Sequence, residues 1–227
     1  NYAKDFELDR PLHTNGPYIH RNMRVPHKVL TKTHCFGYCA DCRPALWLGS
    51  VQDFENGCRR SERPGDGAVS RYDVNVVKSA VHLIRNPLDN MVSRMHLDIE
   101  KRKRLGWNDT ELEGFSNSKD GIRNWCHYLD TKYETQEKQM LDSSIPWQYV
   151  PCHSEFIRYT QWHNHALDMV GQLGIPFHIL YYENYTFAYD TTVTELLDFL
   201  DLARVGKPKP FVPGKTYTYR FDDTATI

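Results

Sequence analysis

The sequence predicts an α/β fold, in which a parallel sheet forms the middle of three layers and helices form the other two. Two kinds of segment alternate along the chain: short apolar runs that suit strands covered on both faces, and longer stretches with apolar residues at helical spacing. Such alternation is typical of parallel sheets, because a helix connects each strand to the next. The 227 residues suffice for one sizeable core, so residues 1–227 are expected to form one domain.

The composition is that of an ordinary globular protein, with 40% hydrophobic and 25% charged residues. Its net charge of −1 gives no overall field that attracts nucleic acid, so an anion site has to be built locally. No apolar run approaches the ~18 residues of a membrane span, and no signal peptide is evident. Because the sequence starts at Asn1 without an initiator Met, we expect it to be part of a longer protein.

The first third of the chain contains one predicted strand and one predicted helix. Residues 1–26 lack a clear periodicity and are expected to be irregular. The strand spans 27–32 and precedes a loop with Cys, Gly and Pro, and a short helix is expected within 45–58. Residues 59–70 are rich in Arg, Gly and Pro and are expected to form an exposed loop insertion.

Strands and helices alternate in the rest of the chain. A strand over 79–84 runs into Pro87, which suits the first position of a helix, and Asp89 favours the positive end of the helix dipole, so a helix is expected over 88–104. Apolar periodicity predicts three more helices and one more strand: helices over 121–141, 153–173 and 190–202, and a strand over 176–182.

Two features of the predicted helices have two interpretations each. The cations from Lys101 to Arg104 either complement the negative end of the helix dipole or form a patch for a sulfated or otherwise acidic acceptor. Phe156 and Trp162 either pack in the core or stack on the adenine of a bound nucleotide.

Polar and cationic side chains follow two of the predicted strands at the point where each strand ends. Lys32 and His34 follow the first strand, and Arg85 follows the strand over 79–84. In parallel α/β sheets, ligands bind outside the carboxyl ends of the strands. The pattern therefore predicts a site for an anionic ligand.

Three segments, in the right order, resemble motifs of the sulfotransferases that use 3′-phosphoadenosine 5′-phosphosulfate (PAPS). Val29-Leu30-Thr31-Lys32-Thr33-His34 resembles their strand followed by Lys-Thr-His. The segment from Leu83 to Arg94 resembles their 3′-phosphate-binding segment, in which an Arg at a strand end and a Ser eight residues later hold the phosphate. Tyr182-Glu183-Asn184 resembles the Tyr-Glu-Asp/Asn that follows a later strand. The resemblance spans about residues 27–220.

The resemblance implies a P-loop NTPase-like fold and the transfer of a sulfuryl group from PAPS to an acceptor hydroxyl. It implies that His34 is the general base for that hydroxyl and that Lys32 neutralises charge on the sulfuryl oxygens. It assigns the 3′-phosphate to Arg85 and Ser93, together with backbone N–H groups at the start of the helix over 88–104.

The resemblance also implies roles for residues near these four and an acceptor for the sulfuryl group. Glu183 is expected to support the site, and Gly214 and Lys215 resemble a C-terminal segment that closes over the nucleotide. No metal is expected. A carbohydrate is the expected acceptor, with protein or small-molecule hydroxyls as alternatives. A non-catalytic domain of the same fold, which binds a nucleotide or a glycan, is the alternative function.

One motif of the family is missing from the sequence. Sulfotransferases carry an N-terminal loop, similar to Pro-Lys-Ser-Gly-Thr-Thr-Trp, whose backbone N–H groups bind the 5′-phosphosulfate. Residues 1–28 contain no such segment. We therefore expect the fold to be N-terminally incomplete, with this loop upstream of Asn1, and we expect the chain by itself to bind PAPS poorly.

The six cysteines allow several structures. Cys35, Cys39 and Cys42 have the C-x₃-C-x₂-C spacing of radical S-adenosylmethionine enzymes, which bind a [4Fe–4S] cluster, and these three with Cys58 could bind zinc. The other possibility is three disulfides, for which fifteen connectivities exist. Disulfides and the glycosylation sequons at Asn108 and Asn184 favour a glycoprotein of the Golgi lumen or secretory pathway over a cytoplasmic protein; its parent could be a type II membrane protein.

Overall fold

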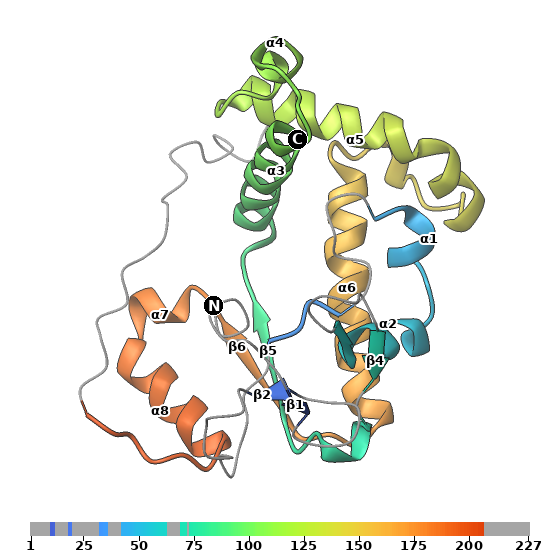
Figure 1. The fold of residues 1–227 in the computed structure, drawn as a ribbon. Coiled ribbons are helices and arrows are strands. Elements are labelled where there is room, and N and C mark those ends of the chain that lie inside the picture. The colour runs from blue at the N-terminus through green and yellow to red at the C-terminus, as the bar shows by residue number, and fades with distance from the viewer. Residues whose placement is uncertain are drawn as a thin grey trace.

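Helices make up most of the part of the chain that the computed structural model describes, and two of the strands form a parallel pair (Figure 1). The described residues are 10–11, 18–19, 32–35, 42–62, 69–71 and 73–206. The α-helices are α1 (Pro44–Trp47), α2 (Val51–Cys58), α3 (Pro87–Arg104), α4 (Asp109–Leu112), α5 (Lys119–Met140), α6 (His153–Gln172), α7 (Asn184–Phe187) and α8 (Tyr189–Phe199). The short 3₁₀ helices are η1 (Val74–Val76), η2 (Glu113–Phe115) and η3 (Trp147–Tyr149). The strands are β1 (Arg10–Pro11), β2 (Tyr18–Ile19), β3 (Arg60–Glu62), β4 (Val69–Arg71), β5 (Ala80–Ile84) and β6 (Phe177–Tyr181).

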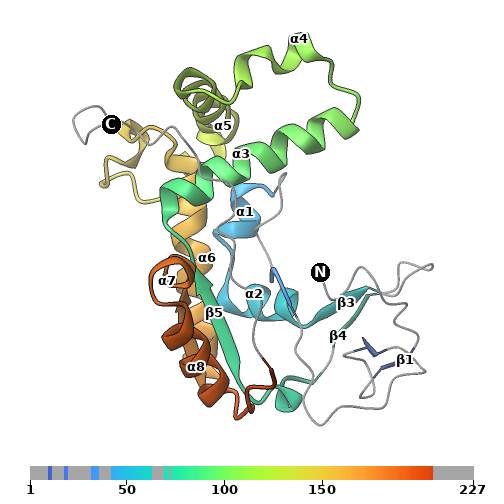
Figure 2. The same ribbon diagram turned by 90° about the vertical axis from the view of Figure 1, so that its left-hand side faces the viewer.

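The parallel pair of β5 and β6 lies between helices. The strands pair in a register that places Ile84 beside Tyr181, so their carboxyl ends are level. His82 faces α6, whereas His178 lies on the opposite face and stacks on α8. Figure 1 shows the same arrangement, with α6 on one side of the pair and α7 and α8 on the other; in Figure 2, turned by 90°, α7 and α8 lie toward the viewer. The fold is α/β, as the sequence predicts.

The two strands are less buried than the sequence predicts. Leu83, Phe177 and Tyr181 are 48%, 44% and 50% exposed. The prediction that these strands are covered on both faces is therefore wrong at these three positions, because the helices that flank the described strand pair do not cover them fully. The third strand, predicted over 27–32, lies outside the described residues except for Lys32, which is in no strand.

Helix α3 begins directly after β5 and has a well-defined start and end. The side chain of Asn86 accepts hydrogen bonds from the N–H groups of the first turn, and Pro87 occupies the first helical position. At the other end, the N–H of Trp107 donates to the carbonyl of Arg102, and Gly106 has a φ of 91°. This is a Schellman ending, which needs a left-handed residue after the helix. These local signals explain why the predicted helix over 88–104 is confirmed.

Helix α6 is fixed at its start by α5. Asp130 accepts hydrogen bonds from the N–H groups of Cys152 and Ser154, at 2.8 and 3.1 Å, and so places a carboxylate at the positive end of the helix. The disulfide between Cys126 and Cys152 links the same two helices covalently. Because α6 also contacts α1, α2, α3 and β5, it is the central support of the described fold.

Two apolar clusters surround α6. The larger one joins α3, α5 and the start of α6 and is made by Met91, Val92, Met95, Ile122, Trp125, Cys126, Leu129, Tyr133 and Cys152. The smaller one joins α2 to the second half of α6 through Phe54, Cys58 and Ala166. Phe156 packs against the first cluster and Trp162 against the second, so both rings take part in packing.

The remaining predicted elements differ in detail from the structure. Helices α5, α6 and α8 and strands β5 and β6 confirm the predicted elements to within a few residues. The single helix expected within 45–58 is two helices, because Ser50 starts α2 with a capping box and so separates it from α1. The two ends of the segment 59–70 pair as the antiparallel strands β3 and β4, and residues 63–68 lie outside the described residues.

Candidate anion-binding and catalytic site

The carboxyl ends of β5 and β6 bring together two of the predicted site residues, Arg85 and Glu183. The Oε1 atom of Glu183 accepts a hydrogen bond from the N–H of Asn86 at 2.8 Å. The N–H of Tyr182 donates to the carbonyl of Ile84 at 2.8 Å and extends the pairing by one residue. Glu183 thus joins the two strand ends and supports the position of Arg85 from the neighbouring strand.

Two aromatic residues hold Arg85. Its guanidinium lies over the ring of Tyr182, 4.9 Å from the ring centre. The hydroxyl of Tyr159, on α6, donates a hydrogen bond of 2.6 Å to the carbonyl oxygen of Arg85. Burial and the nearby carboxylate of Glu183 raise the pKa of Tyr159 above its usual value of 10.0, so the phenol stays protonated and remains a donor.

The N–H groups at the start of α3 are already bonded within the protein. The Oδ1 atom of Asn86 accepts from the N–H groups of Leu88 and Asp89 at 2.9 and 3.4 Å, and the carbonyl of Asn86 accepts from Asn90. Pro87 has no N–H. The expectation that these groups bind an anion is therefore not met in this structure, because the N-cap side chain satisfies them instead.

Ser93 lies farther along α3 and is half-buried. It belongs to the same helix that follows Arg85, so both proposed phosphate ligands are carried by one continuous strand–helix unit. Together, Arg85 and Ser93 offer a forked cation and a hydroxyl, which are suitable donors for phosphate oxygens.

The backbone at His34 and the next residue is linked to α6 and α2. The indole N–H of Trp162, on α6, donates to the carbonyl of His34 at 3.0 Å. The next residue, Cys35, forms a disulfide with Cys58 at the end of α2. Cys35 has a φ of 51°, and its N–H donates to the hydroxyl oxygen of Thr33 at 3.0 Å. The exposed imidazole of His34 is thus carried by an anchored segment.

The surroundings of His34 favour its neutral form. Partial burial, the Lys32 ammonium and the Arg94 guanidinium all lower the pKa of His34 below its usual value of 6.5. A neutral imidazole can accept a proton, whereas an imidazolium cannot. Lys32, which is exposed, lies two residues before His34, so a cation and a proton acceptor are close together.

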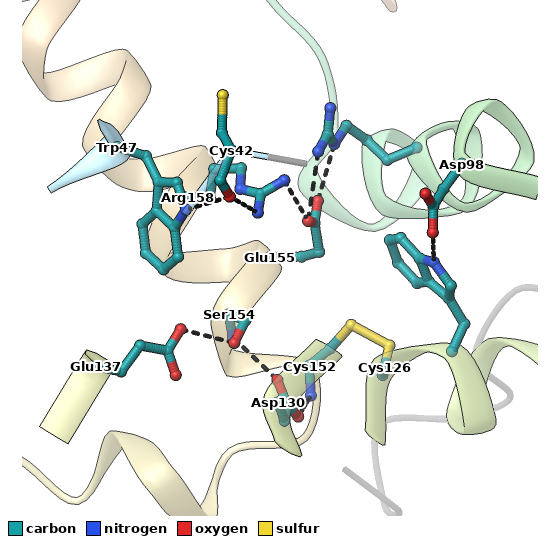
Figure 3. Close-up of polar contacts among 12 residues, drawn as sticks. Cys42, Trp47, Asp98, Cys126, Asp130, Glu137, Cys152, Ser154, Glu155 and Arg158 are labelled. Atoms are coloured by element: carbon teal, nitrogen blue, oxygen red, sulfur yellow. Dashed lines mark hydrogen bonds and ion pairs between the residues drawn. A yellow bond between two sulfur atoms is a disulfide. The ribbon is translucent and has the colours of Figure 1, made fainter. Parts of the chain in front are cut away.

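A network of buried charged side chains joins α3, α6 and the chain at Cys42 (Figure 3). Glu155 on α6 accepts hydrogen bonds from Arg94 of α3 at 2.9 Å and pairs with Arg158 at 3.0 Å. Arg158 also donates to the carbonyl of Cys42 at 3.1 Å, which is shared with the indole of Trp47. The two guanidinium groups hold the pKa of Glu155 below its usual range despite its burial. The sequence gives no sign of this network, because its members are far apart in the chain.

A pair of histidines lies between β5 and α6. The Nε2 atom of His82 is 2.7 Å from the Nδ1 atom of His163. His82 also stacks on Trp162, with 5.5 Å between the ring centres, and Tyr159 contacts the ring of His163. Burial and the neighbouring His82 lower the pKa of His163 to about 4, so both rings are neutral at neutral pH. Sequence reasoning missed this pair, although a histidine inside an apolar strand could have indicated it.

The basic end of α3 does not form a uniform patch. Arg102 is 6% exposed, pairs with Asp98 at 2.9 Å, and lies over the rings of Trp107 and Tyr128. Its guanidinium is therefore part of the packing between α3 and α5. Lys103 and Arg104 are exposed.

Some predicted residues cannot be placed. Gly214, Lys215 and Cys39 lie outside the described residues, as does the strand segment before Lys32. The disulfide between Cys35 and Cys58 leaves neither sulfur as a thiolate ligand for zinc or an iron–sulfur cluster. In the described ranges, no group of His, Cys, Asp and Glu side chains has an arrangement that could hold a metal ion.

Comparison with protein-family models, curated proteins and solved structures finds no match. The two disulfides fit an oxidising, secretory-type environment. No helix in the described part of the chain combines the length and apolarity that a bilayer crossing requires.

Proposed function

We propose that this chain is the 3′-phosphate-binding and catalytic part of a PAPS-dependent sulfotransferase. One observation carries the proposal: Arg85, at the end of β5, lies beside the end of β6 and is held by the same helix, α6, that holds the backbone of His34. An arginine for phosphate and a neutral imidazole for an acceptor hydroxyl are thus fixed to one element. Their order along the chain is the one that the sulfotransferase motifs imply.

The donor set suits the nucleotide. Arg85 supplies a fork of N–H groups for the 3′-phosphate, and Ser93 on α3 supplies a hydroxyl. Lys32 supplies a cation for the sulfuryl oxygens, on which negative charge develops during the transfer. The phosphosulfate-binding loop is proposed to lie in sequence upstream of Asn1.

The reaction follows from these roles. The acceptor hydroxyl oxygen forms a bond to sulfur as the bond from sulfur to the phosphate oxygen of PAPS breaks, and 3′-phosphoadenosine 5′-phosphate (PAP) leaves. His34 takes the proton of the hydroxyl, for which its lowered pKa keeps it unprotonated at neutral pH. A carbohydrate hydroxyl in the lumen of the Golgi is the acceptor that we propose.

The phosphate-binding role is tested by calorimetric titration of the 227-residue chain with PAP and with adenosine 5′-monophosphate, which lacks the 3′-phosphate. Both are expected to bind weakly, so their affinity ratio is the informative quantity. We expect PAP to bind at least about tenfold more tightly, because hydrogen bonds to a charged group contribute about 1.5–3 kcal/mol. Arg85→Ala should abolish the preference.

Arg123→Ala is the matched control, since Arg123 lies on α5 and its side chain is 72% exposed. It should keep the preference for PAP. Equal affinities of the wild-type chain for the two nucleotides would contradict the proposal.

The role of His34 is tested in a protein that includes the upstream loop. His34→Ala should abolish transfer, since a positioned base contributes about 10²–10⁴-fold, while PAP affinity stays within about twofold. Equal losses of PAP affinity in the His34 and Arg85 variants would refute the division of roles. Normal PAP binding with no transfer by the wild type would instead favour a non-catalytic binding domain.

A further inference from the structure

One face of α6 reaches both halves of the proposed site. The hydroxyl of Tyr159 donates to the carbonyl of Arg85 at 2.6 Å, and the indole N–H of Trp162 donates to the carbonyl of His34 at 3.0 Å. Residues three apart on a helix lie on the same face. We propose that Tyr159 and Trp162 are positioning residues that set the distance between the phosphate-binding arginine and the base; this inference rests on the proposed function.

The two contacts fix backbone, not side chains. Each contact is a hydrogen bond to the carbonyl oxygen of the site residue itself. It therefore restricts the backbone position of that residue, and with it the range that the side chain can reach. The side chains themselves have other surroundings: His34 is exposed, and the guanidinium of Arg85 lies over the ring of Tyr182. Sulfuryl transfer depends on alignment of the attacking and leaving oxygens, so a fixed separation of the two residues favours the reaction.

The helix that carries the two donors is well anchored. Asp130 and the disulfide to Cys126 hold its start. Glu155 and Arg158 tie its first turns to α3 and to the chain at Cys42. Because α6 cannot shift easily, Tyr159 and Trp162 can act as fixed points for two segments that are far apart in the sequence.

The rings of both residues are packed independently of their polar atoms. Trp162 stacks on His82 and contacts Phe54, each with 5.5 Å between ring centres. The ring of Tyr159 lies 4.3 Å from that of His163. A phenylalanine at either position keeps an aromatic ring in the same space and removes the hydrogen-bond donor.

The experiment uses Tyr159→Phe and Trp162→Phe in the 227-residue chain. Tyr149→Phe is the control for the hydroxyl, since Tyr149 is 80% exposed. Trp147→Phe is the control for the indole, because the indole N–H of Trp147 is buried and has no hydrogen-bond partner among the described residues. The readouts are PAP affinity by calorimetry and the pKa of His34 by NMR without nucleotide.

The two variants should differ in a defined way. Tyr159→Phe should weaken PAP binding about tenfold, because Arg85 is no longer held in place and has to be ordered when the phosphate binds, and it should leave the His34 pKa unchanged. Trp162→Phe should move the His34 pKa towards its usual 6.5, because the imidazole leaves the place where burial, Lys32 and Arg94 act on it, and should change PAP affinity less than about twofold. Both control variants should match the wild type.

A measurement on the wild-type chain covers the case in which a variant fails to fold. PAP should slow hydrogen exchange of the Trp162 indole N–H and leave that of Trp147 unchanged. The inference is overturned if PAP has no such effect, or if both Phe variants match their controls. Failure of the wild type to prefer PAP over adenosine 5′-monophosphate overturns the proposed function instead, and the nucleotide-free pKa of His34 still tests the contact from Trp162.

Discussion

The arginines of this chain have distinct roles that depend on their partners. Arg94 and Arg158 are buried and share the carboxylate of Glu155, so their charges are compensated inside the protein. Arg102 is buried among aromatic rings and pairs with Asp98. Arg85 is half-buried at the end of a strand, and its guanidinium lies over a tyrosine ring, where a phosphate would add to its contacts.

A prediction at the residue scale concerns the pKa of His34. NMR titration should give a value below 6.5, and Lys32→Met should raise it, because the variant removes the nearest cation that destabilises the imidazolium. Arg104→Met is the control, since Arg104 is exposed at the end of α3 and should leave the value unchanged. A His34 pKa at or above 6.5 in the wild type would show that burial and the two cations do not act on the imidazole as described.

Strand-end residues were accessible to sequence reasoning, whereas the residues that hold them were not. Arg85 was singled out because ligands bind outside the carboxyl ends of parallel strands, and Glu183 because its segment resembles a sulfotransferase motif. Tyr159 and Trp162 contact residues 74 and 128 positions away, so no local sequence pattern predicts these contacts. Helical periodicity predicts which face of α6 is apolar, but not which carbonyl its polar atoms reach.

Elements meet in this fold through polar as well as apolar contacts. The contact between β5 and α6 contains the imidazole pair of His82 and His163, which is hydrogen bonded and neutral. The start of α6 is joined to α5 by the carboxylate of Asp130. The predicted helices were confirmed because their capping residues and apolar periodicity are local features of the sequence. The contacts between helices were not predicted, because they involve residues that are distant in sequence.

At the scale of helices and strands, we predict that the free energy of unfolding decreases as the pH drops from 6.5 towards 4. The folded-state pKa of His163, about 4, is below the unfolded value of 6.5, so the unfolded chain binds more protons in this range. The contribution of His163 to the free energy of unfolding is complete above pH 6.5 and is lost as the pH falls through 4. Its upper limit is about 3 kcal/mol, and the partial exposure of the imidazole reduces this value. Urea unfolding at several pH values measures the effect.

His163→Gln removes the titrating group and should flatten this part of the pH dependence. His127→Gln is the matched control, because His127 is exposed on α5 and should keep the wild-type slope. The same slope in the wild type and in the His163 variant would show that the imidazole pair does not control acid stability.

At the scale of the whole molecule, the described residues contain two disulfides, each beside a segment of the candidate site. One disulfide joins Cys35, beside His34, to the end of α2, and the other joins α5 to the start of α6. The sequence indicated disulfides from the even cysteine count but not their pairing, since spacing alone does not determine which cysteines meet. The parallel sheet is the part of the fold for which the sequence predicts more than the described residues contain.

Reduction of the disulfides should lower the free energy of unfolding. Their sequence separations are 23 and 26 residues. Loops of this size give about 3 kcal/mol for each link in the chain-entropy description. Urea unfolding with and without a phosphine reductant measures the loss, and a variant with both Cys126→Ala and Cys152→Ala isolates the link at the start of α6. An unchanged unfolding midpoint in that variant would show that the noncovalent contacts of α6 suffice to hold it.

The capped start of α3 has a thermodynamic consequence for any ligand that binds beside Arg85. Because Asn86 already satisfies the first N–H groups, the helix end is complete before a ligand arrives. Binding there would order little backbone, so its entropic penalty would fall mainly on side chains and on the ligand. The proposed site would therefore be preorganised, and its affinity would be set by the charge of Arg85 more than by folding around the nucleotide.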